Sequence, residues 1–298
     1  MTAPVLVRSV PSLDHAGFVG ADLARLVTAM RRLGFATTAP KALMRTDPAS
    51  GAAVPLQQQS CHAVFAEGYL ELSAVLSDDA THHLAAYRAR GDGLHILALG
   101  SPDPDSDWQR CSAAGLPCSA PAAASRQIDY GARHGEARFR WFMLQPQVSP
   151  EGLICVVRNE TPELVFQPEV TRHDNGCEAL VEVVVCATAP LATAAHLSIV
   201  TGIEPHPITA NGVDGLTYAL NGGGALSLLS PAAMAARFGA DVVAGLPPDR
   251  FAALQLRVRR LADTATLLEQ NAVPCTRRGP ELIVPPTAAC GAILAFRE

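Results

Sequence analysis

The chain has 298 residues and a formal charge of −5 at pH 7, with 49% hydrophobic and 17% charged residues. This composition indicates a globular protein with a large core and excludes the disordered and coiled-coil classes. With a pI near 6.0, the chain has no positive field that would attract nucleic acid or an anionic membrane surface.

The eight cysteines form no Cys-x-x-Cys pair, and several stand in apolar runs. They are therefore expected to be buried free thiols. Residues 1–12 lack a charged start followed by an apolar stretch, so a cytoplasmic location is expected. Schiff-base chemistry would depend on Lys41, the single lysine, which stands in a loop-like stretch.

The first repeat unit lies in residues 13–75. Residues 13–35 begin with the alternation of a strand, turn at residues 20–22 and continue at helical spacing until Gly34. Three strand-like segments follow, separated by turn signals, at residues 41–45, 56–66 and 68–75. The order of this unit is βαβββ.

The same order recurs three more times. The second copy has a strand at 93–100, a helix at 105–115 and strands at 137–145, 152–159 and 162–167. The third has a strand and helix over residues 180–203 and later strands at 217–221 and 225–229. The fourth, which is shorter, has a strand at 251–259, a helix that extends through Asn271, and strands at 281–284 and 292–296. Repetition of this kind predicts an α+β fold of four modules paired into two half-barrel domains.

The boundary between the two halves is expected where Pro, Asp, Asn and Gly cluster, at residues 168–176. This divides the chain into an N-terminal domain, residues 1–170, and a C-terminal domain, residues 176–298.

Four residues at matching repeat positions are candidates for a metal site. His15 and His95 interrupt the first strands of modules one and two, and Glu71 and Glu163 interrupt the segments assigned as their last strands. A buried carboxylate is costly unless it is paired or metal-bound, so two of them matched with two histidines indicate a shared divalent cation. Glu160 lies close to Glu163, and a shifted register would exchange them.

Each of these residues alone is better explained without a ligand, since a strand histidine is usually a satisfied core residue and a strand glutamate usually faces water. The coincidence of four at equivalent positions favours the metal site.

The segments LDHAGFVG, GYLEL and GLHILAL, within paired βαβββ units, resemble the vicinal oxygen chelate superfamily, which groups glyoxalase, bleomycin resistance and dioxygenase proteins. The segment TPELVFQPEVTRHDNG, residues 161–176, resembles a stretch of uncharacterised glyoxalase-like proteins. The resemblance covers most of residues 10–180. It implies two glyoxalase-like half-barrel domains, with metal ligands from first and last strands at the positions of His15, Glu71, His95 and Glu163.

The second half departs from this pattern. The positions expected to match the four candidate ligands are Val183, Ser227, Gln255 and Leu294, which make no metal set. The C-terminal domain is therefore expected to be a degenerate packing partner or lid.

The resemblance implies a glyoxalase-type lyase or isomerase that acts on a small carbonyl compound through a metal-stabilised enediolate. Nickel, cobalt, zinc or manganese would act as the Lewis acid, and Glu163 or Glu71 would carry the proton. One alternative is an extradiol-type dioxygenase using Fe(II), with two histidines and one carboxylate as ligands. Another is a binding protein that sequesters a small molecule without turnover.

Substrate contacts are expected from a second group of residues. Arg138 and Arg140 share one face of the predicted strand 137–145 and could hold a carboxylate or phosphate, although a solvated outer face is the commoner setting for such a pair. His62 could contact substrate or be structural. A homodimer is a possible assembly, because four modules can complete their barrels within one chain or between two.

Overall fold

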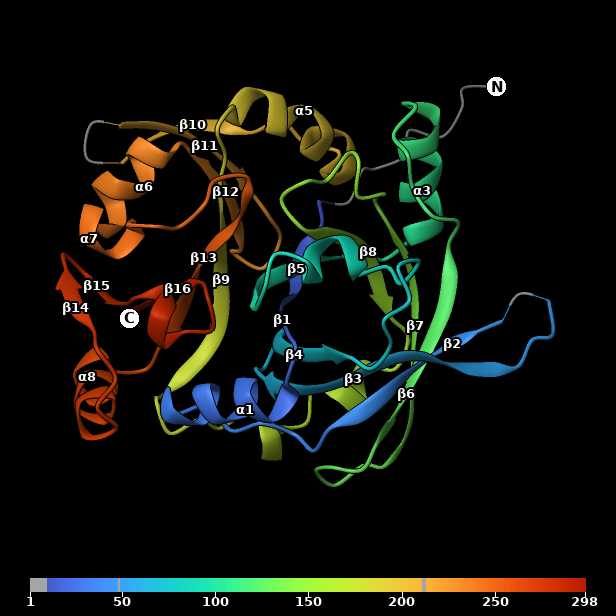
Figure 1. Cartoon of the computed structure of the whole chain (residues 1–298). Coiled ribbons are helices and arrows are strands. Elements are labelled where there is room, and N and C mark those ends of the chain that lie inside the picture. Colours follow the sequence, from blue (N-terminus) through green and yellow to red (C-terminus); the bar gives the residue numbers. More distant parts are fainter. Residues whose placement is uncertain (1–9, 48, 211–212) are drawn as a thin grey trace.

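The computed structural model describes residues 10–47, 49–210 and 213–298 and arranges them as two eight-stranded sheets (Figure 1). The first sheet is a closed barrel and the second is open. The predicted α+β fold, with four modules paired into two halves, is confirmed.

The barrel follows the order β1-β4-β3-β2-β6-β7-β8-β5. Its strands are Ser12–Gly20 (β1), Lys41–Thr46 (β2), Ala53–Val64 (β3), Tyr69–Val75 (β4), Gly93–Gly100 (β5), Ala122–Ile128 (β6), Gly135–Met143 (β7) and Leu153–Asn159 (β8). In each module the first strand pairs in parallel with the last, β1 with β4 and β5 with β8, and the modules meet where β1 runs antiparallel to β5. The two modules are thus related by an approximate two-fold axis.

Two longer helices cross over between strands of the barrel. In α1, Leu23–Arg32, the carboxylate of Asp22 accepts hydrogen bonds from two backbone N–H groups of the first turn, and Gly34 follows the helix with a φ of +84°. In α3, Pro104–Ala113, the proline occupies the first turn, where its missing N–H costs nothing. The shorter helices are Ala85–Arg88 (α2) and Pro162–Val165 (α4).

The second module differs from its prediction. The segment predicted as a strand at residues 162–167 forms α4, because Pro162 has no N–H for a strand ladder and starts a helical turn instead. The last strand is β8, and β6, whose Ala-rich sequence gave no strand signal, supplies the missing one.

The second sheet has the order β10-β11-β12-β9-β13-β16-β15-β14. Its strands are Cys177–Cys186 (β9), His206–Ala210 (β10), Val213–Ala219 (β11), Ala225–Leu229 (β12), Arg250–Val258 (β13), Thr276–Arg278 (β14), Glu281–Val284 (β15) and Ile293–Arg297 (β16). Its helices are Pro190–Thr201 (α5), Pro231–Phe238 (α6), Ala240–Val243 (α7) and Leu261–Gln270 (α8).

Helix α6 covers one face of this second sheet, and a charged side chain anchors it there. Arg237 pairs with Glu182 at 2.6 Å and with Glu281 at 3.1 Å, and Ser227 and Gln255 join the same buried network. This face corresponds to the inside of the barrel. In the second half, side chains of the protein fill the space that corresponds to the cavity of the first half.

The remaining expected equivalents, Val183 and Leu294, face the other way into a hydrophobic core that runs continuously between the two halves. Because the core is shared, the division into domains 1–170 and 176–298 stays a prediction.

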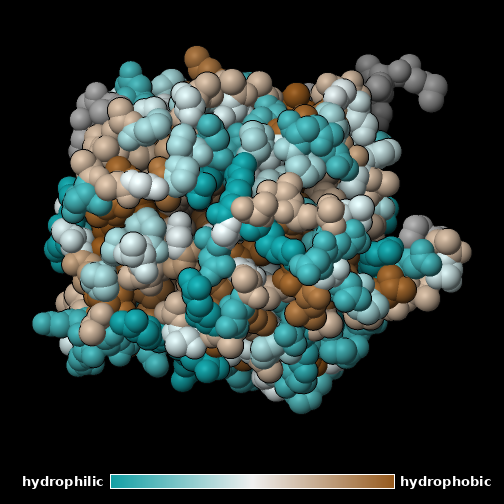
Figure 2. Space-filling view, in the orientation of Figure 1, coloured by the Kyte–Doolittle hydropathy of each residue, from teal (hydrophilic) through white to brown (hydrophobic). Residues whose placement is uncertain are grey.

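Polar residues cover much of the face shown in Figure 2, and hydrophobic ones appear mainly in the recesses between them. Among the described residues, the exposed large hydrophobic side chains are Leu76 and Leu191. No helix in the described part of the chain is long and apolar enough to span a membrane.

Candidate functional site

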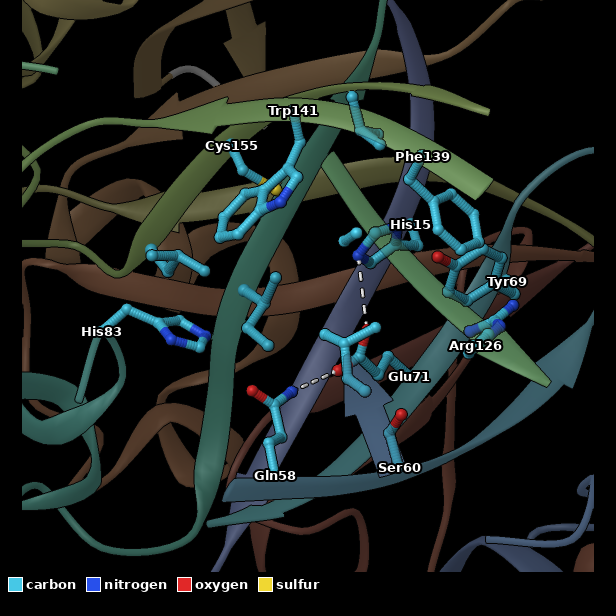
Figure 3. Close-up of a pocket in the computed structure, with 15 residues that line it drawn as sticks. His15, Gln58, Ser60, Tyr69, Glu71, His83, Arg126, Phe139, Trp141 and Cys155 are labelled. Atoms are coloured by element: carbon cyan, nitrogen blue, oxygen red, sulfur yellow. Dashed lines mark hydrogen bonds and ion pairs between the residues drawn. The ribbon is translucent and has the colours of Figure 1, made fainter. Parts of the chain in front are cut away.

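A cavity of about 610 Å³, including its open mouth, lies inside the barrel. Its polar lining residues come from β1, β3, β4 and β6 and, with His83, from the segment before α2, and its aromatic walls come from β4 and β7 (Figure 3). The lining residues are His15, Leu43, Gln58, Ser60, Tyr69, Glu71, His83, Ile96, Ala124, Arg126, Phe139, Trp141, Leu153, Cys155 and Val157.

His15 and Glu71 face each other across this cavity. The Nε2 atom of His15 lies 3.5 Å from Oε2 of Glu71, and both side chains are 9% exposed. The other ring nitrogen, Nδ1, lies 2.7 Å from a carboxylate oxygen of Asp14. The imidazole therefore has a carboxylate at each end, and its orientation is held by both.

The other carboxylate oxygen of Glu71 is held by one donor from the neighbouring strand β3 and one from its own strand, β4. Oε1 accepts hydrogen bonds from the amide of Gln58 at 3.0 Å and from the hydroxyl of Ser73. The same Gln58 amide also donates to Ser73. Glu71 is thus fixed by Oε1, and Oε2 is the oxygen presented to His15 (Figure 3).

Tyr69 lies at the centre of an aromatic cluster. Its ring stacks on His15, with centroids 4.4 Å apart and an interplanar angle of 13°, and it meets the ring of His62 edge to face at 5.0 Å. Burial raises the pKa of Tyr69 well above its usual value, so the phenol stays protonated. Figure 3 shows its hydroxyl turned toward the middle of the cavity.

Arg126 enters the cavity wall from β6. Its Nη1 atom contacts Nε2 of His62, and its guanidinium carbon lies 5.2 Å from the Tyr69 ring centroid and 5.4 Å from that of Phe139. Burial, together with the adjacent guanidinium, lowers the pKa of His62 well below its ordinary value. His62 is therefore neutral and accepts a hydrogen bond from Arg126.

His95 does not join His15. It is 1% exposed, its Nε2 lies 2.8 Å from the carbonyl oxygen of Gly91, and it is absent from the cavity lining. Successive strand residues point to opposite faces, so Ile96, which lines the cavity, turns His95 outward. The structure therefore does not bring His15 and His95 to one face of the sheet, since an offset of one residue reverses the direction of the side chain.

The register identifies the residues that do match. The axis between the modules exchanges the pair Gly17 with Ile96 for the pair Ala98 with His15, both of which occur where β1 meets β5. Ile96 is therefore the equivalent of His15. By the same relation Cys155, which pairs with Ala98 of β5, is the equivalent of Glu71, which pairs with Gly17 of β1. At these matched positions the first module is polar, with His15 and Glu71, and the second has Ile96 and Cys155.

Glu163 is also outside the cavity, because it is an exposed residue of α4. Glu160, the alternative fourth ligand, is exposed just after the end of β8. Neither carboxylate reaches the barrel interior.

The predicted four-ligand metal site is therefore not assembled. Within residues 10–47, 49–210 and 213–298, no group of three or more His, Cys, Asp or Glu side chains is arranged to hold a metal ion. Only His15 and Glu71 of the predicted set converge, and burial raises the pKa of the nearby Cys155 thiol, which disfavours the thiolate that binds metals. The donors present do not fit the metal that the resemblance implies.

The predicted substrate contacts are only partly near the cavity. Arg138 is exposed on the outer face of β7, and Arg140 forms a bidentate pair with Asp105 of α3. The inner face of β7 presents Phe139 and Trp141 instead. His62 is buried behind Tyr69 and contacts Arg126 without lining the cavity.

Sequence reasoning missed several lining residues. Arg126 and Gln58 stand in segments without a recognisable motif, and Trp141 follows Arg140 on a strand where the two arginines were the expected substrate contacts. A usable signal existed for Arg126, a single charge in the run AAASRQI, but that run was not predicted as a strand.

Comparisons with known proteins agree with this architecture. A family model described as a glyoxalase-like domain matches residues 13–201. A comparison with curated proteins found no significant match.

Among solved structures, a hypothetical protein from Staphylococcus aureus is similar with a TM-score of 0.62 and 10% identity, over 97% of this chain and 99% of that one. A mutant 4-hydroxymandelate synthase from Streptomyces coelicolor has a TM-score of 0.61 and 16% identity. The match covers 97% of this chain and 93% of the synthase chain. A xylose isomerase-like TIM barrel/4-hydroxyphenylpyruvate dioxygenase fusion protein has a TM-score of 0.58 and 12% identity. The match covers 100% of this chain and 52% of the fusion protein. At these identities the likeness concerns the fold alone.

Proposed function

We propose, from the premise that this chain belongs to the glyoxalase-like domain family, that its barrel binds a small carbonyl compound and that Glu71 and His15 transfer a proton on it. The family match covers the whole barrel. Members of the superfamily typically use a divalent metal, but the donor set found here does not fit one. The proposal therefore uses only the side chains of the chain itself.

The observation that carries the proposal is the His15 to Glu71 contact of 3.5 Å inside a closed barrel. Oε1 of Glu71 is occupied by Gln58 and Ser73, so Oε2 is the oxygen available to take a proton from a carbon next to a carbonyl. Asp14 accepts the hydrogen bond from Nδ1 of His15, which leaves Nε2 to exchange a proton with the bound molecule or with Glu71. Returning the proton to a neighbouring atom completes an isomerisation without redox change.

The dioxygenase alternative receives less support. An Fe(II) site of two histidines and one carboxylate would need a second histidine beside His15 and Glu71. His95 faces outward, and His83, which lines the cavity, forms no three-residue ligand group with them in the described part of the chain. The likeness to dioxygenase-type structures reflects the shared fold.

A specific observation favours the sequestering protein as the second candidate. Ile96, Leu153 and Cys155 give the second module an unreactive lining at the positions that His15, Tyr69 and Glu71 occupy in the first. Such a lining can hold a small molecule without reacting with it.

Deuterium exchange separates the two candidates. Small hydroxyketones and 2-oxo acids are incubated with the protein in D2O, and loss of the C–H signal beside the carbonyl is followed by NMR. We expect catalysed exchange by the wild type and a loss of about 100-fold in Glu71→Gln, the usual contribution of a general base. Glu163→Gln is the matched control, because that carboxylate is exposed on α4, and it should be unaffected.

Equal exchange by wild type and Glu71→Gln would overturn the proton-transfer proposal. Saturable binding of the same compounds with no catalysed exchange would establish the sequestering candidate instead.

A further inference from the structure

Arg126 is a buried cation without an anionic partner. It is 4% exposed, and within the described ranges no Asp or Glu oxygen lies within 4.0 Å of its guanidinium. A guanidinium stays protonated in proteins, so burial cannot neutralise it as it neutralises histidine. Such a charge is strongly unfavourable unless something compensates for it.

The contacts of Arg126 supply only part of this compensation. The rings of Tyr69 and Phe139 lie within cation–π distance, and neutral His62 accepts from Nη1. The guanidinium also contacts the side chain of Tyr130, which counteracts the rise that burial causes in the pKa of that phenol. Nε and Nη2 are buried without a hydrogen-bond partner among the described residues. Two donor nitrogens thus remain unused on a residue that lines the cavity.

These two nitrogens form the side edge of the guanidinium, which matches the two oxygens of a carboxylate. Arg140 of the same protein shows this geometry, because its Nε and Nη2 bind the two oxygens of Asp105 at 3.0 and 2.6 Å. In Arg126, which lines the cavity, no carboxylate of the described residues occupies the same edge.

The residues that line the cavity near Arg126 indicate what the rest of the ligand should be. Phe139, Tyr69 and Trp141 provide aromatic faces, and the indole Nε1 of Trp141 is also buried without a hydrogen-bond partner in the described part of the chain. Aromatic walls suit a flat apolar body, and an unused indole donor suits a neutral oxygen acceptor. Tyr69 lies between Arg126 and His15, so one ring separates the cationic edge from the Glu71 pair.

We propose that Arg126 is the anchor for the carboxylate of a small aromatic or otherwise flat acid bound in the barrel. This assignment rests on the proposed function and narrows its substrate class to carboxylates. The bound carboxylate supplies the missing counter-charge, and the remainder of the ligand extends past Tyr69 toward Glu71.

Benzoate and benzamide test the anchor, because they differ little in shape but only benzoate is charged. Their dissociation constants are measured by titration calorimetry and ligand-observed NMR for wild type, Arg126→Gln, Arg126→Lys and the control Arg140→Gln. We expect benzoate to bind wild type and Arg140→Gln equally and at least ten times more tightly than benzamide. Arg126→Gln should weaken the binding of benzoate at least tenfold and leave the binding of benzamide nearly unchanged. Arg126→Lys should weaken the binding of benzoate less.

Thermal unfolding without ligand provides a second measurement that does not depend on binding. An unpaired charge kept for a ligand is not needed for folding, so Arg126→Gln should melt at or above the wild-type temperature. A large decrease in melting temperature, no benzoate binding by wild type, or equal loss of benzoate and benzamide would overturn the anchor. If the anchor proposal is wrong but the proton-transfer proposal is right, deuterium exchange on neutral hydroxyketones is still catalysed. If the proton-transfer proposal is wrong, that exchange is absent, while benzoate still binds as expected.

Discussion

Ile96 stands in the second module at the position that His15 occupies in the first. Both side chains line the cavity, and the pairs Gly17 with Ile96 and His15 with Ala98 are exchanged by the two-fold relation between the modules. The barrel therefore has one imidazole where a symmetric site would have two.

This relationship predicts how a metal site can be introduced. The double variant Ile96→His and Cys155→Glu places an imidazole and a carboxylate at the positions equivalent to His15 and Glu71, which completes a set of two histidines and two carboxylates. We expect the affinity for Zn²⁺ or Ni²⁺ to rise by at least about tenfold over wild type, because each added ligand strengthens chelation. Titration calorimetry measures it.

The control for this experiment is His95→Ala. Its imidazole faces away from the cavity, so metal affinity of the double variant should be unchanged when this substitution is added. Loss of the gained affinity on removal of His95 would show that the assigned strand register is wrong.

His173 makes stability depend on pH. Its Nδ1 accepts from the N–H of Ala36 and its Nε2 donates to the carbonyl of Val64, so only the neutral ring satisfies both contacts. Burial lowers its pKa below the usual 6.5. As pH falls below about 6.5 the unfolded chain takes up a proton that the folded chain does not, so the free energy of unfolding decreases toward the folded pKa.

We expect His173→Gln to lower the free energy of unfolding by about 1–3 kcal/mol at pH 7.5, for the lost hydrogen bonds, and to weaken its decrease between pH 7.5 and 5. Urea denaturation at several pH values measures both effects. His134→Gln, at an exposed position, is the control. An unchanged pH slope in His173→Gln would contradict the prediction.

Gly152 allows the two halves to approach closely. A Cβ atom there would lie 2.8 Å from the carbonyl oxygen of His95 and would overlap the ring of Phe251 from β13. We expect Gly152→Ala to destabilise the protein by about 1–3 kcal/mol, the usual range for overpacking. Gly115→Ala removes a glycine with open space around its Cβ position but a φ of +72°, so it reports the backbone cost alone. A smaller loss at Gly152 than at Gly115 would count against the close packing.

Arg237 compensates two carboxylates on the covered face of the second sheet. Its removal in Arg237→Met leaves Glu182 and Glu281 buried without their cation, and we expect a loss of about 3–5 kcal/mol in unfolding free energy. The exposed pair Arg259 with Glu178 is the comparison, and Arg259→Met should cost little. Equal losses in the two variants would show that the network is not a buried one.

The repeated βαβββ order was readable from the sequence because turn residues and alternating patterns are local features, and they determined the α+β fold. The same alternation located His15 and Glu71 on the strands that the structure brings together. Local signals were sufficient here because each strand has one buried face in any arrangement of the sheet.

Only the tertiary structure decided which face of β5 points inward, because the side-chain period of two makes an offset of one residue invisible in an apolar run such as GLHILALG. It also decided that Arg140 of β7 pairs with Asp105 of α3 while Arg126 is buried without a carboxylate, since contacts between segments far apart in the chain are not visible in local sequence patterns. Sequence determined the modules. The register between them, which depends on contacts across the barrel, determined the chemistry of the cavity.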